Sequence, residues 1–157
     1  RASRGAVLLV FPPQTRPVYD TAQMAYTVRP YEIAFFSQHE WAETPARMLQ
    51  PLLVKTLENT GSFRAVLAPP YAARYNYALR TELRELVADF TSQPAAVQLS
   101  LRFELSEGTA GRIVAVREIS IREPLRAKTP YAGVIAANDA VAKALLELAR
   151  LVLDKTS

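Results

Sequence analysis

The sequence has no cysteine, and this absence excludes several kinds of chemistry at once. Disulfides, thiolate nucleophiles and thiolate metal sites all require that side chain. The chain has one histidine and only five glycines, and it contains neither a G-x-G-x-x-G pattern nor a P-loop. We therefore exclude these phosphate-binding loops. A chain without cysteine fits an oxidising or a reducing compartment, so this feature does not indicate location.

Long apolar runs are also missing. No stretch approaches the roughly 18–20 apolar residues that span a bilayer, and the segment from Ala6 to Pro13 has the length of a strand. Because the chain starts at Arg1 rather than at methionine, we expect a processed or truncated form, with any signal peptide ahead of the numbering.

The charge is moderately basic, with a formal net charge of +4 and a pI of about 9.6. Most basic residues are arginines that alternate with acids, as in Arg80, Glu82, Arg84 and Glu85. This mixture is typical of an ordinary soluble surface. Attraction to anionic lipid headgroups or to nucleic acid is the alternative.

The hydrophobic pattern predicts a single α+β domain over residues 1–157, with residues 1–5 as a tether remnant. The chain length suffices for one core. Helices are expected from Thr44-Pro45 to Gly61 and over 134–152, since both show apolar residues at helical spacing. We expect two layers: a largely antiparallel sheet with the two main helices packed on one face. The predicted strands cover residues 6–11, 23–28, 31–38, 63–67, 97–105 and 112–122.

Three segments are less regular. Residues 77–91 fit a helix by the spacing of Leu79, Leu83 and Leu86 and a strand by alternation, so periodicity leaves both open. Pro51 lies inside the first predicted helix and should kink it or divide it. The alternation of the strand 112–122 slips near Arg117-Glu118, which suggests a bulge or a change of face.

The inventory of polar residues does not support catalysis, so we assign no catalytic residue. His39 is the sole imidazole, and no nucleophile or orienting acid accompanies it. For metals only carboxylates remain, without an EF-hand pattern. Glu104 and Glu118 are placed to face each other across a hairpin, yet such pairs on a wet sheet face are usually solvated or salt-bridged. We expect no metal and no cofactor.

Apolar side chains exceed what two helices need to bury. They belong to an aromatic strand, to the segment after it and to a wide apolar arc on the last helix. One interpretation is a well-filled core, and the other is a contact surface for lipid or a partner subunit. The candidate contact residues are Tyr31, Phe35, Phe36, Trp41, Ile135 and Leu146.

A basic nucleic-acid-binding α+β domain is the alternative function. An RNA-recognition sheet would expose aromatic residues among basic ones on its central strands. The polar face of the strand 97–105 instead carries Gln98, Ser100, Arg102 and Glu104. This weakens the alternative, and we expect no nucleic-acid partner.

Three pieces of the sequence resemble the ABC-type transport auxiliary lipoprotein family, which includes the auxiliary lipoproteins of paraquat-inducible membrane systems. The first is Met24-Ala25-Tyr26 with Arg29-Pro30-Tyr31-Glu32-Ile33-Ala34-Phe35-Phe36. The second runs from His39-Glu40-Trp41-Ala42-Glu43 through Pro45-Ala46-Arg47-Met48-Leu49 to Leu57-Glu58, Gly61-Ser62-Phe63 and Val66. The third is Tyr131-Ala132-Gly133-Val134-Ile135-Ala136-Ala137-Asn138-Asp139-Ala140-Val141. The likeness covers most of the chain and is loosest over 68–95.

The resemblance implies a non-catalytic periplasmic domain held at the cell envelope, at the outer membrane, through a lipid anchor upstream of Arg1. It further implies an ABC permease and ATPase and an MCE-type substrate-binding protein as partners. The sequence itself leaves open whether the chain forms a homo-oligomer. The transported compounds would be lipids or other apolar molecules. The resemblance also favours a strand for residues 77–91. It carries over no site residue.

Overall fold

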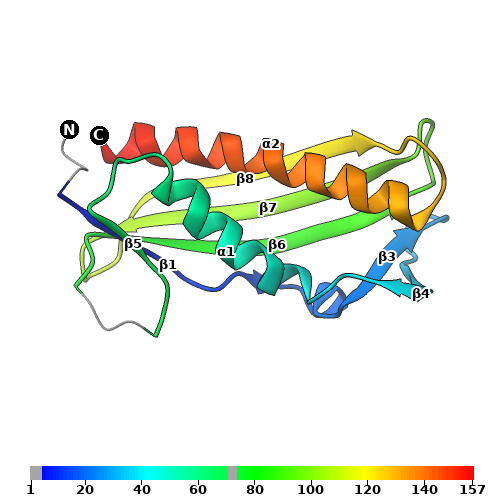
Figure 1. The fold of residues 1–157 in the computed structure, drawn as a ribbon, viewed down its shortest axis with the longest axis horizontal. Helices are drawn as coiled ribbons and strands as arrows, with labels where there is room; N and C mark the ends of the chain where they lie inside the picture. Colours follow the sequence, from blue (N-terminus) through cyan, green and yellow to red (C-terminus); the bar gives the residue numbers. More distant parts are fainter. Residues whose placement is uncertain (1–4, 71–73) are drawn as a thin grey trace.

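The computed structural model describes residues 5–70 and 74–157. Apart from Gly5, the expected tether over residues 1–5 lies outside the described residues. The described chain forms one mixed sheet with two α-helices over one of its faces (Figure 1). The predicted α+β class and the placement of both helices on one face are therefore confirmed.

The strand β6 (Tyr77–Asp89) organises the sheet, because other strands pair along both of its edges. One edge pairs antiparallel with β7 (Ala96–Glu107), and β7 pairs antiparallel with β8 (Arg112–Pro124). These are the longest ladders in the sheet. Residues 77–91 are thus a strand for most of their length, as the resemblance favoured.

The other edge of β6 takes three short strands in succession, all parallel to it. They are β1 (Val7–Val10), β2 (Gln14–Thr15) and β3 (Gln23–Thr27). β1 also pairs in parallel with β5 (Ala65–Leu67), while β3 pairs antiparallel with β4 (Ala34–Glu40). The segment between β1 and β3 contains β2 and a short 3-10 helix, Pro17–Tyr19.

Two strand details differ from the sequence-based expectation. The strand predicted over 31–38 begins at Ala34 and continues to Glu40, and Tyr31 has a φ of 66° that no strand can accommodate. The irregularity in β8 lies opposite Leu105 and Ser106, at Val114, whereas pairing is regular at Arg117 and Glu118. The alternation of polar and apolar residues breaks near Arg117 because this residue shares a strand face with apolar neighbours but lies at an exposed edge of the sheet.

The helix α1 (Pro45–Glu58) starts as predicted, with Thr44 at the N-cap and Pro45 at the first position. The Thr44 side chain makes no capping hydrogen bond. Pro51 does not divide the helix, which continues through it to Glu58 with the proline on the exposed side. After two further residues Gly61 adopts a φ of 66°, a conformation that glycine tolerates best.

The helix α2 (Pro130–Thr156) is longer at both ends than the predicted 134–152. Its start repeats the signal seen at α1: Thr129 accepts a hydrogen bond from the Ala132 N–H through its side chain, and Pro130 follows. Small alanines on its buried side let it lie close to the sheet.

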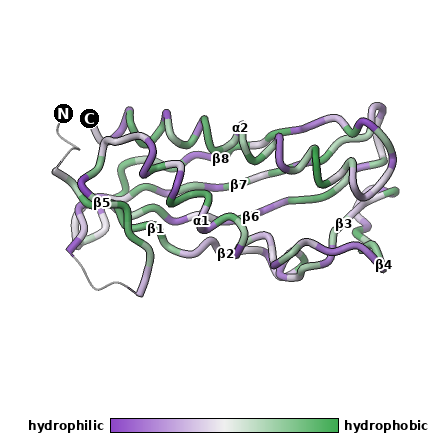
Figure 2. The backbone as a smooth tube through the Cα atoms, viewed as in Figure 1, coloured by the Kyte–Doolittle hydropathy of each residue, from purple (hydrophilic) through white to green (hydrophobic). Residues whose placement is uncertain are grey.

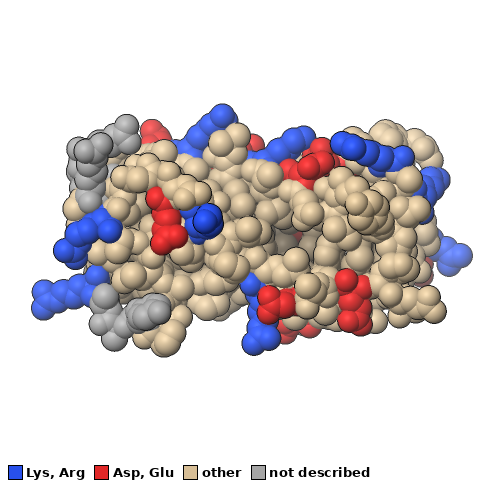
Figure 3. Space-filling model, viewed as in Figure 1, with Lys and Arg blue, Asp and Glu red and all other residues tan. Residues whose placement is uncertain are grey.

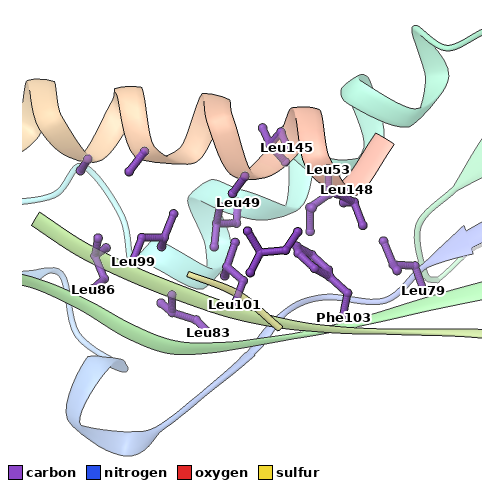
Figure 4. Packing of buried hydrophobic residues seen from close by; sticks show 14 of the residues in the cluster. Leu49, Leu53, Leu79, Leu83, Leu86, Leu99, Leu101, Phe103, Leu145 and Leu148 are labelled. Carbon is purple, nitrogen blue, oxygen red and sulfur yellow. The ribbon is translucent and has the colours of Figure 1, made fainter. Parts of the chain in front are cut away.

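The core lies between the helices and the sheet. Alternate residues of β6 and β7 point into it, and Figure 2 shows the resulting alternation of hydrophilic and hydrophobic positions along these strands. Phe103, Leu101 and Leu148 are fully buried, and the leucines of both helices interdigitate with those of the sheet (Figure 4). Burial of each such side chain contributes about 1.5–3 kcal/mol to folding.

Candidate functional site

An apolar cleft of about 290 Å³ lies between α1 and α2. Its floor is the sheet, its two walls are the facing sides of the helices, and Trp41 lies at one end. Figure 3 shows the face that carries it: charged groups stand mostly around the margin, and the middle is hollowed. The lining residues are Trp41, Pro45, Met48, Leu49, Leu52, Leu83, Leu86, Leu99, Ala137, Asn138, Val141, Ala142 and Leu145.

The spacing of residues on the helices explains why the cleft is there. On α1, Leu52 lies four residues after Met48 and three after Leu49, which places all three on one helix face. The facing side of α2 carries Ala137 and Ala142, whose methyl groups are too short to fill the gap. Leu52 remains 46% exposed at the rim. The two helices therefore leave space between them instead of packing closely.

The cleft has almost no electrostatic character. Its polar lining side-chain groups are the Asn138 amide and the indole N–H of Trp41, and no lining residue is ionisable. Such a surface binds through the removal of apolar area from water, and a single amide can orient a polar group at the mouth. The arrangement suits an acyl chain or an apolar side chain of a partner. It offers no acid, base or nucleophile for a reaction.

Of the candidate contact residues, only Trp41 lines the cleft. Phe36 stacks on Tyr26 with ring centroids 4.5 Å apart, and Phe35 packs against the main core. Ile135 is half-buried on α2. Tyr31 and Leu146 are exposed at separate places. The structure thus does not bring these six together.

Sequence reasoning missed the lining residues Met48, Leu52 and Val141. Their helical spacing was visible, but the same spacing is expected of core residues. The sequence does not determine the distance between two helices, so the apolar residues of a closed core and those of a cleft wall show the same helical spacing.

The residues considered for catalysis and metal binding are dispersed. His39 is exposed near the end of β4, with its ring 6.4 Å from that of Phe36. Glu104 and Glu118 do not face each other, because the register pairs Glu104 with Val116 and Glu118 with Arg102. Within residues 5–70 and 74–157, no three potential ligands of the His, Cys, Asp or Glu type gather at one point.

The sheet face away from the helices carries mixed charges. Arg84 forms ion pairs of 2.8 Å with Glu82 and 3.0 Å with Glu118. Its hydrogen bond with Glu82, followed by that with Glu118, raises the pKa of the Arg84 guanidinium despite an opposing effect of desolvation. Arg102 lies 3.8 Å from Glu104. This face therefore presents alternating charges rather than a continuous basic track.

No helix in the described part of the chain is both long enough and apolar enough to cross a membrane.

Comparison with solved structures reveals a shared fold. Protein XCC0632 from Xanthomonas campestris superposes with a TM-score of 0.89 at 23% identity, covering 99% of this chain and 91% of that one. The PelC dodecamer from Paraburkholderia phytofirmans gives a TM-score of 0.56 at 17% identity, with coverage of 91% and 88%. Protein CT253 from Chlamydia trachomatis gives 0.53 at 8% identity, with coverage of 91% and 96%.

No curated protein matches the sequence. The family model of the ABC-type transport auxiliary lipoprotein component, however, matches residues 1–149. The match spans the sheet, α1 and most of α2, and it agrees with the three resembling pieces of the sequence. The chain belongs to the ABC-type transport auxiliary lipoprotein family.

Proposed function

We propose that this protein serves an ABC-type envelope transport system for lipids or other apolar compounds by holding one acyl chain in the cleft between α1 and α2. The observation that carries the proposal is the composition of that cleft, which is apolar apart from the Asn138 amide and the indole N–H of Trp41. An acyl chain needs a narrow apolar groove and one orienting polar group at its mouth. The protein acts as a non-catalytic binding component.

The cleft has a suitable size. Its volume of about 290 Å³ equals that of about ten water molecules in the liquid, at about 30 Å³ each. A methylene group is of similar size, so the cleft accommodates much of one acyl chain. A sterol or a whole phospholipid exceeds this volume. We therefore expect the headgroup and the second chain to lie outside.

The experiment is native mass spectrometry of the gently purified protein, followed by lipid transfer from labelled vesicles. Ala142→Phe places a ring at the cleft wall and should remove bound lipid. Leu146→Phe adds the same ring about one turn along α2, outside the cleft, and should retain it. Wild-type protein that is free of lipid and transfers none would overturn the proposal, as would equal lipid loss in both variants.

The partners and the anchor belong to the same proposal. An ABC permease and ATPase and an MCE-type protein would exchange the bound chain, and a lipid anchor ahead of Arg1 would hold the domain at the outer membrane. The family assignment supports an envelope lipoprotein. A lipid-modified cysteine in the gene product before Arg1, with genes for those partners alongside, is the expected result; their absence would contradict it.

Self-association is a further part of this proposal. The described part of β8 pairs only with β7, so its outer edge has free backbone donors and acceptors. The structurally similar PelC forms a dodecamer. Light scattering coupled to size exclusion should give a mass above that of one 17.4 kDa chain. A single monomeric species at high concentration would exclude it.

The nucleic-acid alternative gains no support from the structure. A phosphate backbone requires a row of unpaired basic residues, whereas Arg84 and Arg102 on the open face are paired with glutamates.

A further inference from the structure

The register of the sheet gathers several chain segments at one end of the molecule. Asp89 at the end of β6 pairs with Thr27 of β3 and with Ala96 of β7, and Ala96 pairs with Pro124 at the end of β8. The loops that follow or precede these residues therefore lie together. We define this distal end as residues 28–33, 90–95 and 125–131 (right side of Figure 1).

The described N-terminal strand begins at the opposite end. Leu8 of β1 pairs with Tyr77, the first residue of β6. β6 has 13 residues, which at about 3.3 Å per residue separates the two ends by about 40 Å. An anchor ahead of Arg1 would thus hold the end that lies away from these loops.

The distal end exposes large apolar and aromatic side chains. The exposed fractions are 59% for Val28, 106% for Tyr31, 41% for Ile33 and 74% for Tyr131. Single exposed apolar residues are common on soluble proteins, but a concentration of them indicates a contact surface. Four of the eight large hydrophobic residues that the described chain exposes lie at this end.

The backbone at Tyr31 is strained. Its φ of 66° lies in the left-handed region, which costs a residue with a Cβ atom about 1–2 kcal/mol. The Tyr31 side chain is fully exposed, so packing within the chain does not offset this cost. Backbone conformations of this kind are enriched at binding and catalytic sites.

The charges at the distal end are mainly positive. Arg29, Arg126 and Lys128 are exposed there, against one exposed acid, Glu32. Arg29 lies 3.8 Å from Glu32, whereas Arg126 and Lys128 form no ion pair with any described residue. In Figure 3 lysine and arginine atoms border this end of the molecule. The exposed loops therefore complement a negative surface.

The carboxylate of Asp89 holds the start of the loop after β6 in place through hydrogen bonds. The Asp89 carboxylate accepts hydrogen bonds from the Thr91 N–H and hydroxyl and from Arg122, at 3.1 Å. Desolvation raises the pKa of this carboxyl, but these hydrogen bonds outweigh it and the pKa is lowered overall. Arg122 is thereby neutralised, so Arg126 and Lys128 remain as the charges that a partner meets.

We propose that the distal end is a contact site for an anionic phospholipid surface. Val28 and Ile33 enter the boundary of the acyl region, Tyr31 and Tyr131 lie at the level of the headgroups, and the basic residues meet phosphates. A protein partner would have to supply a pocket for a fully exposed tyrosine, whereas a bilayer interface needs none. The inference does not depend on the cleft, which lies elsewhere.

The test is co-sedimentation of the 157-residue protein with vesicles. We expect binding to phosphatidylglycerol mixed with phosphatidylethanolamine, little binding to phosphatidylcholine alone, and weakening at high salt. Arg126→Gln with Lys128→Gln should lower the partition coefficient by about fivefold for each charge. Val28→Ser with Ile33→Ser should lower it by about tenfold.

The matched control is Ile113→Ser with Val116→Ser. These residues are exposed by 55% and 47%, similar to Val28 and Ile33, but they lie on the first half of β8. This variant should bind like wild type. No binding to anionic vesicles at low salt overturns the proposal and assigns the distal end to a protein partner. Equal losses of vesicle binding in the Val28→Ser/Ile33→Ser variant and in the Ile113→Ser/Val116→Ser control overturn it as well.

Tyr31→Gly separates a structural role from a contact role. Glycine adopts a positive φ without strain, so this variant should unfold at a higher temperature than wild type. It should nevertheless bind anionic vesicles more weakly, because the tyrosine is gone. A variant that is more stable and binds as well as wild type would count against the proposal. Lipid in the cleft, measured by native mass spectrometry, should be unchanged, so failure of one proposal is distinguishable from failure of the other.

Discussion

The cleft can be probed by comparing two leucines on the same helix. Leu148 of α2 is fully buried, whereas Leu145 lines the cleft and is 9% exposed. Both lie in the interior of α2 and belong to the cluster of buried hydrophobic residues (Figure 4). Leucine and alanine have similar helix propensities, so replacement of either by alanine changes packing rather than the helix itself.

The expected costs differ because of what surrounds each side chain. Leu148→Ala leaves a closed cavity and should lower the free energy of unfolding by about 3–5 kcal/mol. Leu145→Ala extends a space that is already open. Its cost is limited to the lost transfer energy, about 0.8 kcal/mol for each of three carbon atoms and less where they were exposed, hence about 2 kcal/mol.

Urea unfolding measures both values, and an unchanged slope shows that the unfolded state is the same. Leu145→Ala should also gain more stability than wild type from a medium-chain fatty acid, since the enlarged cleft binds more of it. If Leu145→Ala costs as much as Leu148→Ala and gains nothing from the fatty acid, the cleft is closed in solution and our reasoning about it is wrong.

Three further predictions concern local structure. Asp89→Asn should destabilise the fold by about 1–2 kcal/mol near neutral pH. Because folding lowers the pKa of Asp89 from its usual 3.8, the carboxylate stabilises the fold above that pH and loses this effect as the pH falls below it. The stabilities of wild type and variant should therefore converge in acid-unfolding experiments. Thr129→Ala should cost about 1 kcal/mol because it removes a capping bond, whereas Thr44→Ala should cost less in thermal unfolding since Thr44 makes none. Gly61→Ala should cost about 1 kcal/mol in urea, through the positive φ alone, because no atom lies within 4 Å of the added methyl group.

The sequence predicted the regular parts of the fold because their patterns are local. The alternation over 97–105 located β7, and a side-chain oxygen followed by proline located the start of α1. The same pair, Thr129-Pro130, marks the start of α2, four residues before the apolar stripe that begins at Val134 and predicts a shorter helix.

The ambiguity of residues 77–91 has a physical cause in the structure. The register of β6 shifts between Leu83 and Glu85, so one extra residue is inserted into the strand. Leu79, Leu83 and Leu86 therefore all point into the core although their spacing is four and then three, as on a helix. A bulge imitates helical periodicity, and neighbouring strands rather than the segment itself decide the outcome.

The candidate site was less accessible to sequence reasoning. Trp41 was identified as part of a contact surface, and it lines the cleft. Tyr31 and Phe36 share an aromatic segment just ahead of Trp41, and this pattern predicts a common surface. The turn at Tyr31 and the start of β4 at Ala34 separate them in space, and neither feature has a marker such as glycine in the sequence.

The strands that pair along the two edges of β6 lie at very different distances from it in the sequence, and this should set the order of folding. β7 and β8 follow β6 closely in the chain, so these three strands can form a meander early. β1 instead pairs with a strand about seventy residues further along the chain, as in the pairing of Leu8 with Tyr77. Closing so long a loop is slow. We therefore expect the first strand to dock last, and hydrogen-exchange labelling during refolding should find its amides protected after those of β7.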